Sequence, residues 1–450
     1  MRSFFRCAAI AGINVLLFLA GSNVQGESLQ NEIKHVLQTN PQIRAVAYSR
    51  LARDQEVIQA KGGYYPTLDA SVSAGIDERL HTFASDPTIT RPKATILSLN
   101  QNVFQFGATQ SEVRLQEARV QSQAYLLQST SEETALATAR VYLALLQSME
   151  MYDLAKENLL NHERISDQMK LRSTSGVDRK ADFDQVMGRL ALAQSGIVVT
   201  TANIVDAKTN YQFVIGRLPG DLTKPDSLDS AIPTSMDAVE KLAVDNYPRL
   251  KSARADLEAR KAQYETARRV VYPKLDLAVG YQWQTDVDYP QRQEDFLATA
   301  VLRFNVFNGM RDKARIAQNF QLINEAQEIL NTTQREVIQS IRLSWESYMA
   351  ARERVIFLEE YVRSAGLTAE AFAAQWNIGR RTMFDLLDTQ QEYITAKQSL
   401  VTARYDKLFA EYRVLTGMGK LVETLGLKWP DESRVETKLT ELVPLPNWPD

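Results

Sequence analysis

The chain has 450 residues, with 52 Lys and Arg against 55 Asp and Glu, so its formal net charge is −3. This balance excludes the clustered basic excess that nucleic-acid binding requires, and a hydrophobic content of 44% argues against a helical membrane protein. No proline lies between Pro92 and Pro219 or between Pro290 and Pro430. Such long spans without a loop breaker favour long helices over a row of globular domains.

Residues 1–26 are predicted to be a signal peptide. Arg2 and Arg6 precede an apolar run from Cys7 to Ala20, and small and polar residues follow. The run is shorter than the roughly 20 residues of a spanning helix, which favours export over the alternative of a membrane anchor. Cys7 is the single cysteine, so the exported chain is expected to lack disulfides. No later stretch reaches about 18 consecutive apolar residues, so membrane residence would require β-strands.

The chain contains two copies of one unit, which is the most informative feature of the sequence. The run Tyr-Pro-Thr-Leu-Asp at 65–69 recurs as Tyr-Pro-Lys-Leu-Asp at 272–276, and Asn-Val-Phe at 102–104 recurs at 305–307. Gly176 with Asp182 recurs as Gly379 with Asp385 in the same order. We therefore expect a first repeat over 27–230, a second over 231–418, and a C-terminal tail over 419–450.

Each repeat is expected to form a helix, a β-hairpin and two long helices. The first helix is predicted over Pro41–Gly62. Period-2 alternation predicts strands at Leu68–Ile76 and about Thr95–Phe104, and in the second repeat at 275–283 and 296–306. The hairpins thus cover 68–104 and 275–306. The strands have about the 9–11 residues that cross a tilted bilayer. A soluble β-sandwich is the alternative, although four strands are few for one. A closed barrel needs at least about eight strands, which implies oligomerisation.

Long helices are predicted over 108–216 and 310–416. The stretch from Ala108 to Ser175 contains neither Gly nor Pro, and as one helix it would be about 100 Å long. Two apolar stripes on its surface, one through Leu143 and one through Tyr142, predict two helical neighbours. A cytosolic coiled-coil rod would explain these helices, but it would not explain the hairpins or the signal peptide.

Taken together, the duplicated plan and its motifs resemble the TolC family of outer-membrane efflux and secretion channels, over about Ser28–Met418. The motifs are Tyr-Pro-x-Leu-Asp before each hairpin, Asn-Val-Phe-Gln-Phe-Gly and Asn-Val-Phe-Asn-Gly after it, and Trp-Asn-Ile-Gly-Arg-Arg-Thr-Met-Phe-Asp-Leu-Leu-Asp at 376–388. The last is similar to the family's hairpin tip, Gly-x-Arg followed by Asp-x-x-Asp.

The resemblance implies a mainly α-helical homotrimer with membrane β-structure. Three chains would close one twelve-stranded β-barrel among outer-membrane lipids and continue it as an α-helical periplasmic tunnel of coiled helices. The helix near Met236–Asn246 and the segment after Met418 would form a belt around the tunnel. A periplasmic adaptor and an inner-membrane ABC exporter, or a proton-driven pump, would be the partners.

No enzyme motif occurs in the sequence, and we expect no cofactor. The three histidines, His35, His81 and His162, are too dispersed to predict a metal site. No phosphate-binding Gly-rich loop occurs. Transport through the protein is therefore expected to be passive.

Asp385 and Asp388 are three residues apart at a predicted helix start, so they share a face. On sequence alone, capping of the helix is an equally good role for them. By resemblance they match the family's acidic entrance ring, a cation-favouring filter. The resemblance also assigns Arg381 to the gate, with Glu150 as its acidic partner and Trp376 in place of the family's tyrosine.

The hairpin tips, marked by Gly176, Asp182 and Gly379, are expected to dock an adaptor, although ordinary interhelical turns would contain the same residues. The run Val-Ile-Gly-Arg-Leu-Pro-Gly-Asp-Leu at 214–222 resembles the branch that works with ABC exporters in type I secretion, including adhesin export. Drug or metal efflux is the alternative function, and a periplasmic scaffold without a channel is a third.

Overall fold

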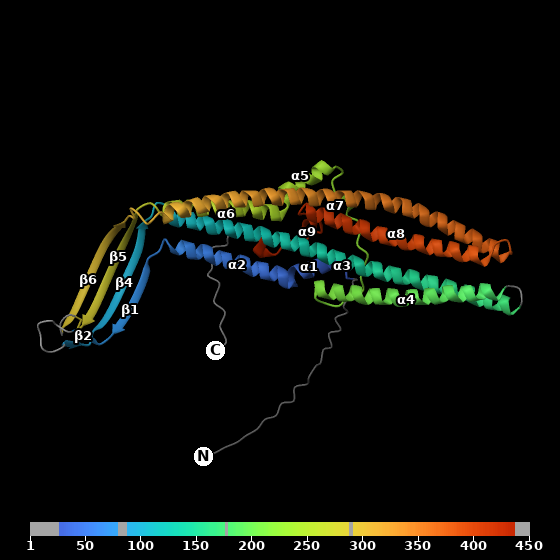
Figure 1. The fold of residues 1–450 in the computed structure, drawn as a ribbon, viewed down its shortest axis with the longest axis horizontal. Helices are drawn as coiled ribbons and strands as arrows, with labels where there is room; N and C mark the ends of the chain where they lie inside the picture. The colour runs from blue at the N-terminus through green and yellow to red at the C-terminus, as the bar shows by residue number, and fades with distance from the viewer. Residues whose placement is uncertain (1–26, 80–87, 176–178, 288–290, 437–450) are drawn as a thin grey trace, which may run out of the picture.

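The computed structural model describes residues 27–79, 88–175, 179–287 and 291–436. The molecule is elongated, with a β-sheet at one end and the ends of two pairs of long helices at the other (Figure 1). The predicted signal peptide, and with it Cys7, lies outside the described residues.

The elements follow the expected order in both repeats. The first repeat contains α1 (Leu29–Thr39), α2 (Pro41–Gly62), β1 (Thr67–Ala74), β2 (Asp77–Arg79), β3 (Thr88–Thr90), β4 (Lys93–Phe104), α3 (Ala108–Thr174) and α4 (Lys180–Ile215). The second contains a short 3-10 helix (Asp229–Ala231), α5 (Met236–Asn246), α6 (Pro248–Arg269), β5 (Lys274–Thr285), β6 (Arg292–Arg303), α7 (Arg311–Asn377) and α8 (Met383–Gly417). After it come α9 (Leu421–Thr424) and a 3-10 turn (Asp431–Ser433).

Local signals account for several boundaries. The side chain of Asn40 accepts hydrogen bonds from the backbone amides of Gln42 and Ile43, and Pro41 occupies the first turn, so α2 begins where it was predicted. Two features were missed by sequence reasoning. Helix α1 precedes α2, and the small β2–β3 ladder lies between the two predicted strands of the first hairpin, where no strand was predicted.

The main sheet has four antiparallel strands in the order β1-β4-β5-β6. Pairing of β4 with β5 joins the hairpins of the two repeats, while β1 and β6 remain as edges. The register aligns Leu68 with Leu99, Leu99 with Val279, and Val279 with Ala298. Because side chains alternate between faces, these four apolar residues share one face of the sheet. One continuous apolar face matches a sheet that contacts lipid.

The largest core lies midway along the helices. It joins residues of α1 to α5 and of α7 to α9 around fully buried aromatic residues, including Tyr142 of α3, Tyr211 of α4 and Tyr412 of α8. A second, smaller core lies at the hairpin end. The segment after Met418, which was expected to join a belt, packs against this central core through Leu421 and Val422.

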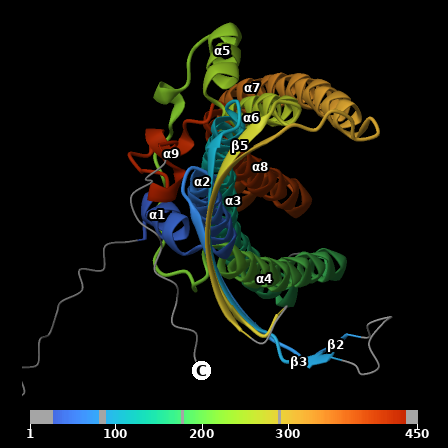
Figure 2. The same cartoon turned by 90° about the vertical axis from the view of Figure 1, so that its left-hand side faces the viewer.

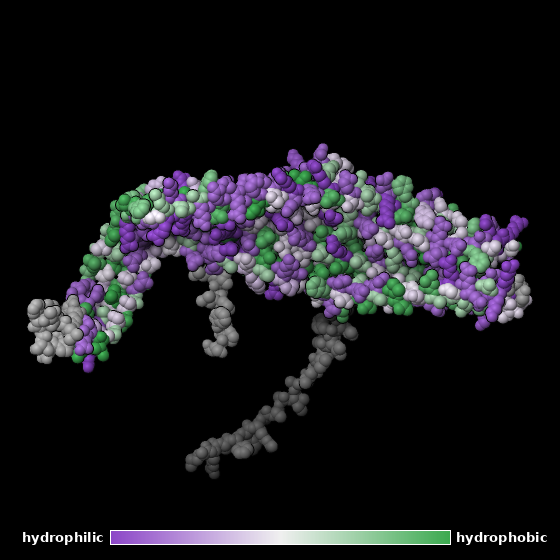
Figure 3. Space-filling view, viewed as in Figure 1, coloured by the Kyte–Doolittle hydropathy of each residue, from purple (hydrophilic) through white to green (hydrophobic). Residues whose placement is uncertain are grey.

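The long helices form a curved wall. Helix α3 packs against α2 and α4 on one side and against α6 and α8 on the other, and α7 packs against α6 and α8. Thus α2 and α4 form one lateral edge of the wall and α7 forms the other. Figure 2 shows α1 and α9 on the opposite side of α3 from α4, α7 and α8. In Figure 3 hydrophilic residues gather at the hairpin end, while hydrophobic residues are exposed along the helices.

Candidate functional site

The end of α3, the start of α4 and the turn between α7 and α8 lie at the same end of the molecule, opposite the sheet (Figure 1). A small apolar core joins them there, built from α3, α4, α7 and α8. Its buried members are Ile165, Met169, Val186, Trp376, Met383, Leu386 and Leu387. This core places the motif residues 376–388 beside the first hairpin, so the tip is one packed unit within a single chain.

Arg381 lies in the turn between α7 and α8 and is held by its own hairpin. Its guanidinium carbon lies 4.1 Å from the centroid of the Phe372 ring, and its Nε donates to Gln375 Oε1 at 3.0 Å. Its Nη1 lies 4.0 Å from Asp385 Oδ2. The cation therefore has a ring face, an amide and a carboxylate around it.

Asp385 forms a capping box with Thr382 at the start of α8. The Thr382 hydroxyl accepts from the Asp385 amide, and Asp385 Oδ2 accepts from the Thr382 amide at 3.2 Å and the Thr382 hydroxyl at 2.9 Å. These hydrogen bonds from Thr382, together with the charge of Arg381, lower the pKa of Asp385. The carboxylate therefore stays ionised and caps the helix as well.

Asp388 lies one turn further along α8 and has a different partner. Its Oδ1 is 3.2 Å from Nη2 of Arg189 on α4. Both predicted carboxylates therefore lie at the tip, as the sequence indicated, but each is paired with a cation. Arg189 was missed because no local pattern in the sequence marks a contact between residues 199 positions apart. Phe372 and Gln375 were missed because they precede the motif at 376–388 on α7.

Within one chain, the other predicted tip residues contribute to the packing and to the helix ends of the tip. Trp376 is buried in the tip core, and its ring lies 5.2 Å from the guanidinium carbon of Arg172. Gly379 ends α7 with φ of +74°, a left-handed conformation that favours glycine. Asp182 lies in the first turn of α4 and is half-buried. Gly176 lies outside the described residues.

Glu150 does not lie at this end, which corrects the assignment of this residue as the partner of Arg381. It is 24 residues before the end of α3, or about 36 Å along the helix. Its carboxylate is 4.0 Å from Lys224 Nζ. Burial raises the pKa of Tyr405 on α8, and the charge of Glu150 raises it further. In an oligomer whose symmetry axis runs along the helices, Glu150 has the same position along that axis in every copy. The Glu150 of a neighbouring copy would therefore be equally far from Arg381 along the axis.

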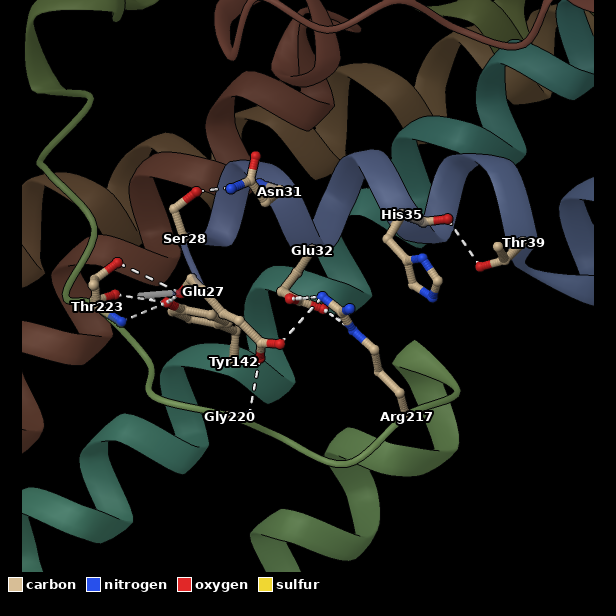
Figure 4. Close-up of polar contacts among 10 residues, drawn as sticks. All are labelled: Glu27, Ser28, Asn31, Glu32, His35, Thr39, Tyr142, Arg217, Gly220 and Thr223. Carbon is tan, nitrogen blue, oxygen red and sulfur yellow. Dashed lines mark hydrogen bonds and ion pairs between the residues drawn. The ribbon is translucent and has the colours of Figure 1, made fainter. Parts of the chain in front are cut away.

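The segment 214–222 lies in the central core region, where it holds the N-terminal part of the described chain (Figure 4). Arg217 forms an ion pair with Glu32, whose side chain is fully buried. The Gly220 amide donates to Glu27 Oε2 at 2.9 Å. The Tyr142 hydroxyl lies within hydrogen-bond distance of the carbonyls of Glu27 and Thr223. The contacts of Arg217 and Gly220 therefore give segment 214–222 a structural role within the single chain.

Within residues 27–79, 88–175, 179–287 and 291–436, no three side chains of His, Cys, Asp or Glu are grouped as a metal site requires. One helix in the same ranges, α4, is long and apolar enough to cross a membrane by length and composition. That criterion alone is weak evidence for a membrane span, and α4 packs lengthwise against α3.

Comparison with known proteins gives one consistent result. A family model described as "Outer membrane efflux protein" matches residues 33–217 and 240–420. The chain is 23% identical to the outer membrane efflux protein BepC of Brucella suis, over 94% of this chain and 93% of that protein. It is 23% identical to the outer membrane protein TolC of Escherichia coli, over 89% and 83%.

A protease secretion protein of Dickeya chrysanthemi, PrtF, is 21% identical over 91% of this chain and 92% of its own length. Among solved structures, the CmeC outer membrane channel of Campylobacter jejuni superposes with a TM-score of 0.78. That match covers 90% of this chain and 89% of the channel, at 13% identity. A likeness at this identity supports the fold.

Proposed function

Since this chain belongs to the outer membrane efflux protein family, whose members are non-enzymatic channels of the Gram-negative outer membrane that extend into the periplasm, we propose that it is the exit duct of a tripartite export system. In this proposal three copies form the duct, a periplasmic adaptor docks at the hairpin tips, and an inner-membrane transporter supplies the energy. The duct itself is passive.

The observation that carries this proposal is the pair of uncovered edges. The apolar face of α4, with Val198 70% exposed and Phe213 89% exposed, lies at one lateral edge of the wall. The apolar residues Phe357 and Leu367 of α7, 66% and 64% exposed, lie at the other. Among the described residues, no strand pairs with the outer side of β1 or of β6 at the two edges of the sheet.

Exposed apolar faces and open strand edges are unfavourable in an isolated chain. If α7 and β6 of one copy contacted α4 and β1 of the next copy, the exposed apolar faces and the open strand edges would be covered together. Three copies of a four-stranded sheet give a closed twelve-stranded barrel. In this arrangement the long apolar surface of α4 packs against the neighbouring subunit.

For the cargo, we propose protein or adhesin secretion driven by an ABC exporter of the type I kind. The resemblance of segment 214–222 and the match to a protease secretion protein over nearly the whole chain support this assignment. Drug or metal efflux is the second candidate, because the family description and the name of BepC both refer to efflux.

Deletion of the gene separates these two functions. Under the secretion proposal a large protein disappears from the culture medium and accumulates in the cells, while susceptibility to drugs and metal ions stays unchanged. An unaltered set of secreted proteins with increased drug or metal susceptibility would support efflux instead.

The channel itself is tested in planar lipid bilayers with the purified, cross-linked oligomer. Asp385→Asn with Asp388→Asn removes the proposed acidic ring while leaving an oxygen that can accept the hydrogen bond at the α8 cap. We expect a lower permeability ratio of K⁺ to Cl⁻ than in the wild type. Equal ratios for the two proteins would exclude the ring.

Adaptor docking is tested by cross-linking at the tips. Single cysteines in place of Asp182 or Gly379, in a chain with Cys7 replaced, should cross-link to the adaptor in cells. A cysteine in place of Phe213, far from the tip in the sequence of α4, serves as the control. Cross-links that form equally at all three positions would argue against docking at the tip.

A further inference from the structure

Arg189 and Asp388 connect the two helical hairpins of one chain at the tip. Their ion pair spans 3.2 Å between α4 and α8. The Arg189 side chain is 31% exposed and that of Asp388 is 72% exposed, so the pair faces solvent on the carboxylate side. A second ion pair between the hairpins, Lys397 with Glu157, lies nine residues further along α8 from the tip.

Beneath this pair lies a histidine that the proposed function does not use. His162 of α3 is 3% exposed, and its Nδ1 has no hydrogen-bond partner within the described residues. Burial lowers the pKa of His162, and the positive charge of Arg189 lowers it further. The imidazole is therefore neutral at pH 7.

Arg189 is the charged group that acts on this imidazole. Other charged residues of these helices are exposed to solvent, namely Glu163 and Arg164 on α3, Asp184 on α4 and Glu392 on α8. Glu157 on α3 is paired with Lys397 on α8. Three helices thus contribute to this group: α3 provides the buried neutral His162, α4 the half-buried Arg189 and α8 the exposed Asp388. Protonation of the base would place a second positive charge beside Arg189, where burial limits screening by water.

We propose that Arg189 is a specificity-determining residue of the channel entrance, because it neutralises Asp388 and ties the two hairpins together. The proposal rests on the proposed channel function. While the pair is formed, Asp388 contributes little net charge to the opening. When Arg189 is displaced, the carboxylate becomes available to cations and the hairpins lose a tie near the tip. Protonated His162 favours this displacement.

The first test is ion selectivity in planar bilayers under a KCl gradient. Arg189→Gln should raise the permeability ratio of K⁺ to Cl⁻ about twofold or more, because each subunit exposes one more unpaired carboxylate. Arg404→Gln is the matched control. Arg404 on α8 pairs with Glu359 on α7 at 2.9 Å, but this pair lies within one hairpin. We expect wild-type selectivity from the control.

Double substitution shows whether Arg189 acts through Asp388. Under the proposal, Arg189→Gln changes selectivity in the wild type but has a much smaller effect in a chain that already carries Asp388→Asn. If Arg189→Gln fails to assemble alone, the comparison of the double variant with Asp388→Asn still decides the question. A ratio in Arg189→Gln equal to that of the wild type, or an equal effect in both backgrounds, overturns the proposal.

The second test is the pH dependence of channel opening. Acid should increase the open probability of the wild type, and His162→Gln should move this increase to lower pH, where only carboxylates titrate. A profile identical to that of the wild type would overturn the role of His162. If the wild-type oligomer forms no channel at all, the proposed function fails, whereas a conducting wild type with an unaffected Arg189→Gln rejects this inference alone.

Discussion

Glu132 and Trp429, 297 positions apart in the sequence, are joined by a hydrogen bond of 3.0 Å from the indole Nε1 to Glu132 Oε1. The same carboxylate accepts from the backbone amides of Leu421 and Val422 at 3.0 and 3.2 Å. Glu132 is fully buried on α3. One buried carboxylate thus fixes the segment that follows α8 against the first repeat.

This arrangement predicts a pH-dependent stability. Burial raises the pKa of Glu132 from 4.5 to about 7, despite the three hydrogen bonds that favour the charged form. Because the folded pKa exceeds the unfolded one, proton binding stabilises the fold fully below pH 4.5, and this stabilisation is lost as the pH rises through about 7. The shift corresponds to about 3 kcal/mol. Denaturation followed by tryptophan fluorescence between pH 5 and 8 measures it.

Glu132→Gln should remove most of this pH dependence, since no ionisable group remains at the site. Glu133→Gln is the control, because it removes the same charge from an exposed neighbour on α3 and should leave the slope intact. An unchanged slope in Glu132→Gln would show that another group titrates in this range.

Arg217 is predicted to be essential for the stability of the central region. Glu32, its partner, is fully buried, so Arg217→Ala leaves a buried carboxylate without its cation. Loss of one partner of a buried pair costs about 3–5 kcal/mol. The value here is expected near the lower limit, because Arg217 itself is partly exposed. The free energy of unfolding in denaturant measures the effect.

Two further variants separate the charge from the packing at this pair. Arg217→Lys keeps the charge and should lose less stability than Arg217→Ala. The double variant Glu32→Gln with Arg217→Ala should recover part of the loss, since it removes the unpaired charge. If the double variant is less stable than Arg217→Ala, the buried charge is not the cause.

Much of the fold followed from the sequence because its signals are local and repeated. Alternation over 275–283 located β5, and the absence of Gly and Pro from Ala108 to Ser175 located α3. Strand order could not be derived in this way, since the pairing of β4 with β5 joins residues of different repeats. Helix α1 was missed because it is short and separated from α2 by the single residue Asn40.

The tip was predicted in part for the same reason. Asp385 and Arg381 lie within one contiguous motif, so the sequence could place them together. Arg189 and Asp388 are 199 positions apart, and no pattern in a single sequence pairs them. Glu150 was assigned from the family resemblance alone, and an error of register in such an alignment moves a residue by about 1.5 Å per position along the helix.

Gly379 should tolerate substitution poorly, although space surrounds it. Within the described residues, no atom beyond its own chain neighbours lies within 4 Å of the position that a Cβ would occupy, so the cost arises from its φ of +74°. Gly379→Ala is expected to destabilise the end of α7 by about 1 kcal/mol. Gly379→Asn should cost less, because asparagine tolerates the left-handed region. Amide hydrogen exchange in the last turn of α7 measures both, and equal protection in alanine and asparagine variants would contradict this explanation.

Arg381 is expected to restrain the channel through contacts that depend on the shape of its guanidinium. Arg381→Ser removes the contacts with Phe372, Gln375 and Asp385 together, and should raise single-channel conductance. Arg381→Lys keeps the charge but loses the planar group that lies over the ring, so an intermediate conductance is expected. Phe372→Leu should also raise conductance, since it removes the ring while leaving the arginine in place.

The conductance of these three variants in planar bilayers separates charge from positioning. An order of Arg381→Ser above Arg381→Lys, with Phe372→Leu above the wild type, supports a guanidinium held in position by the ring. If Phe372→Leu conducts like the wild type while Arg381→Ser conducts more, charge alone carries the effect. Wild-type conductance in Arg381→Ser would remove Arg381 from the gate, because its contacts with Phe372, Gln375 and Asp385 would then have been lost without consequence.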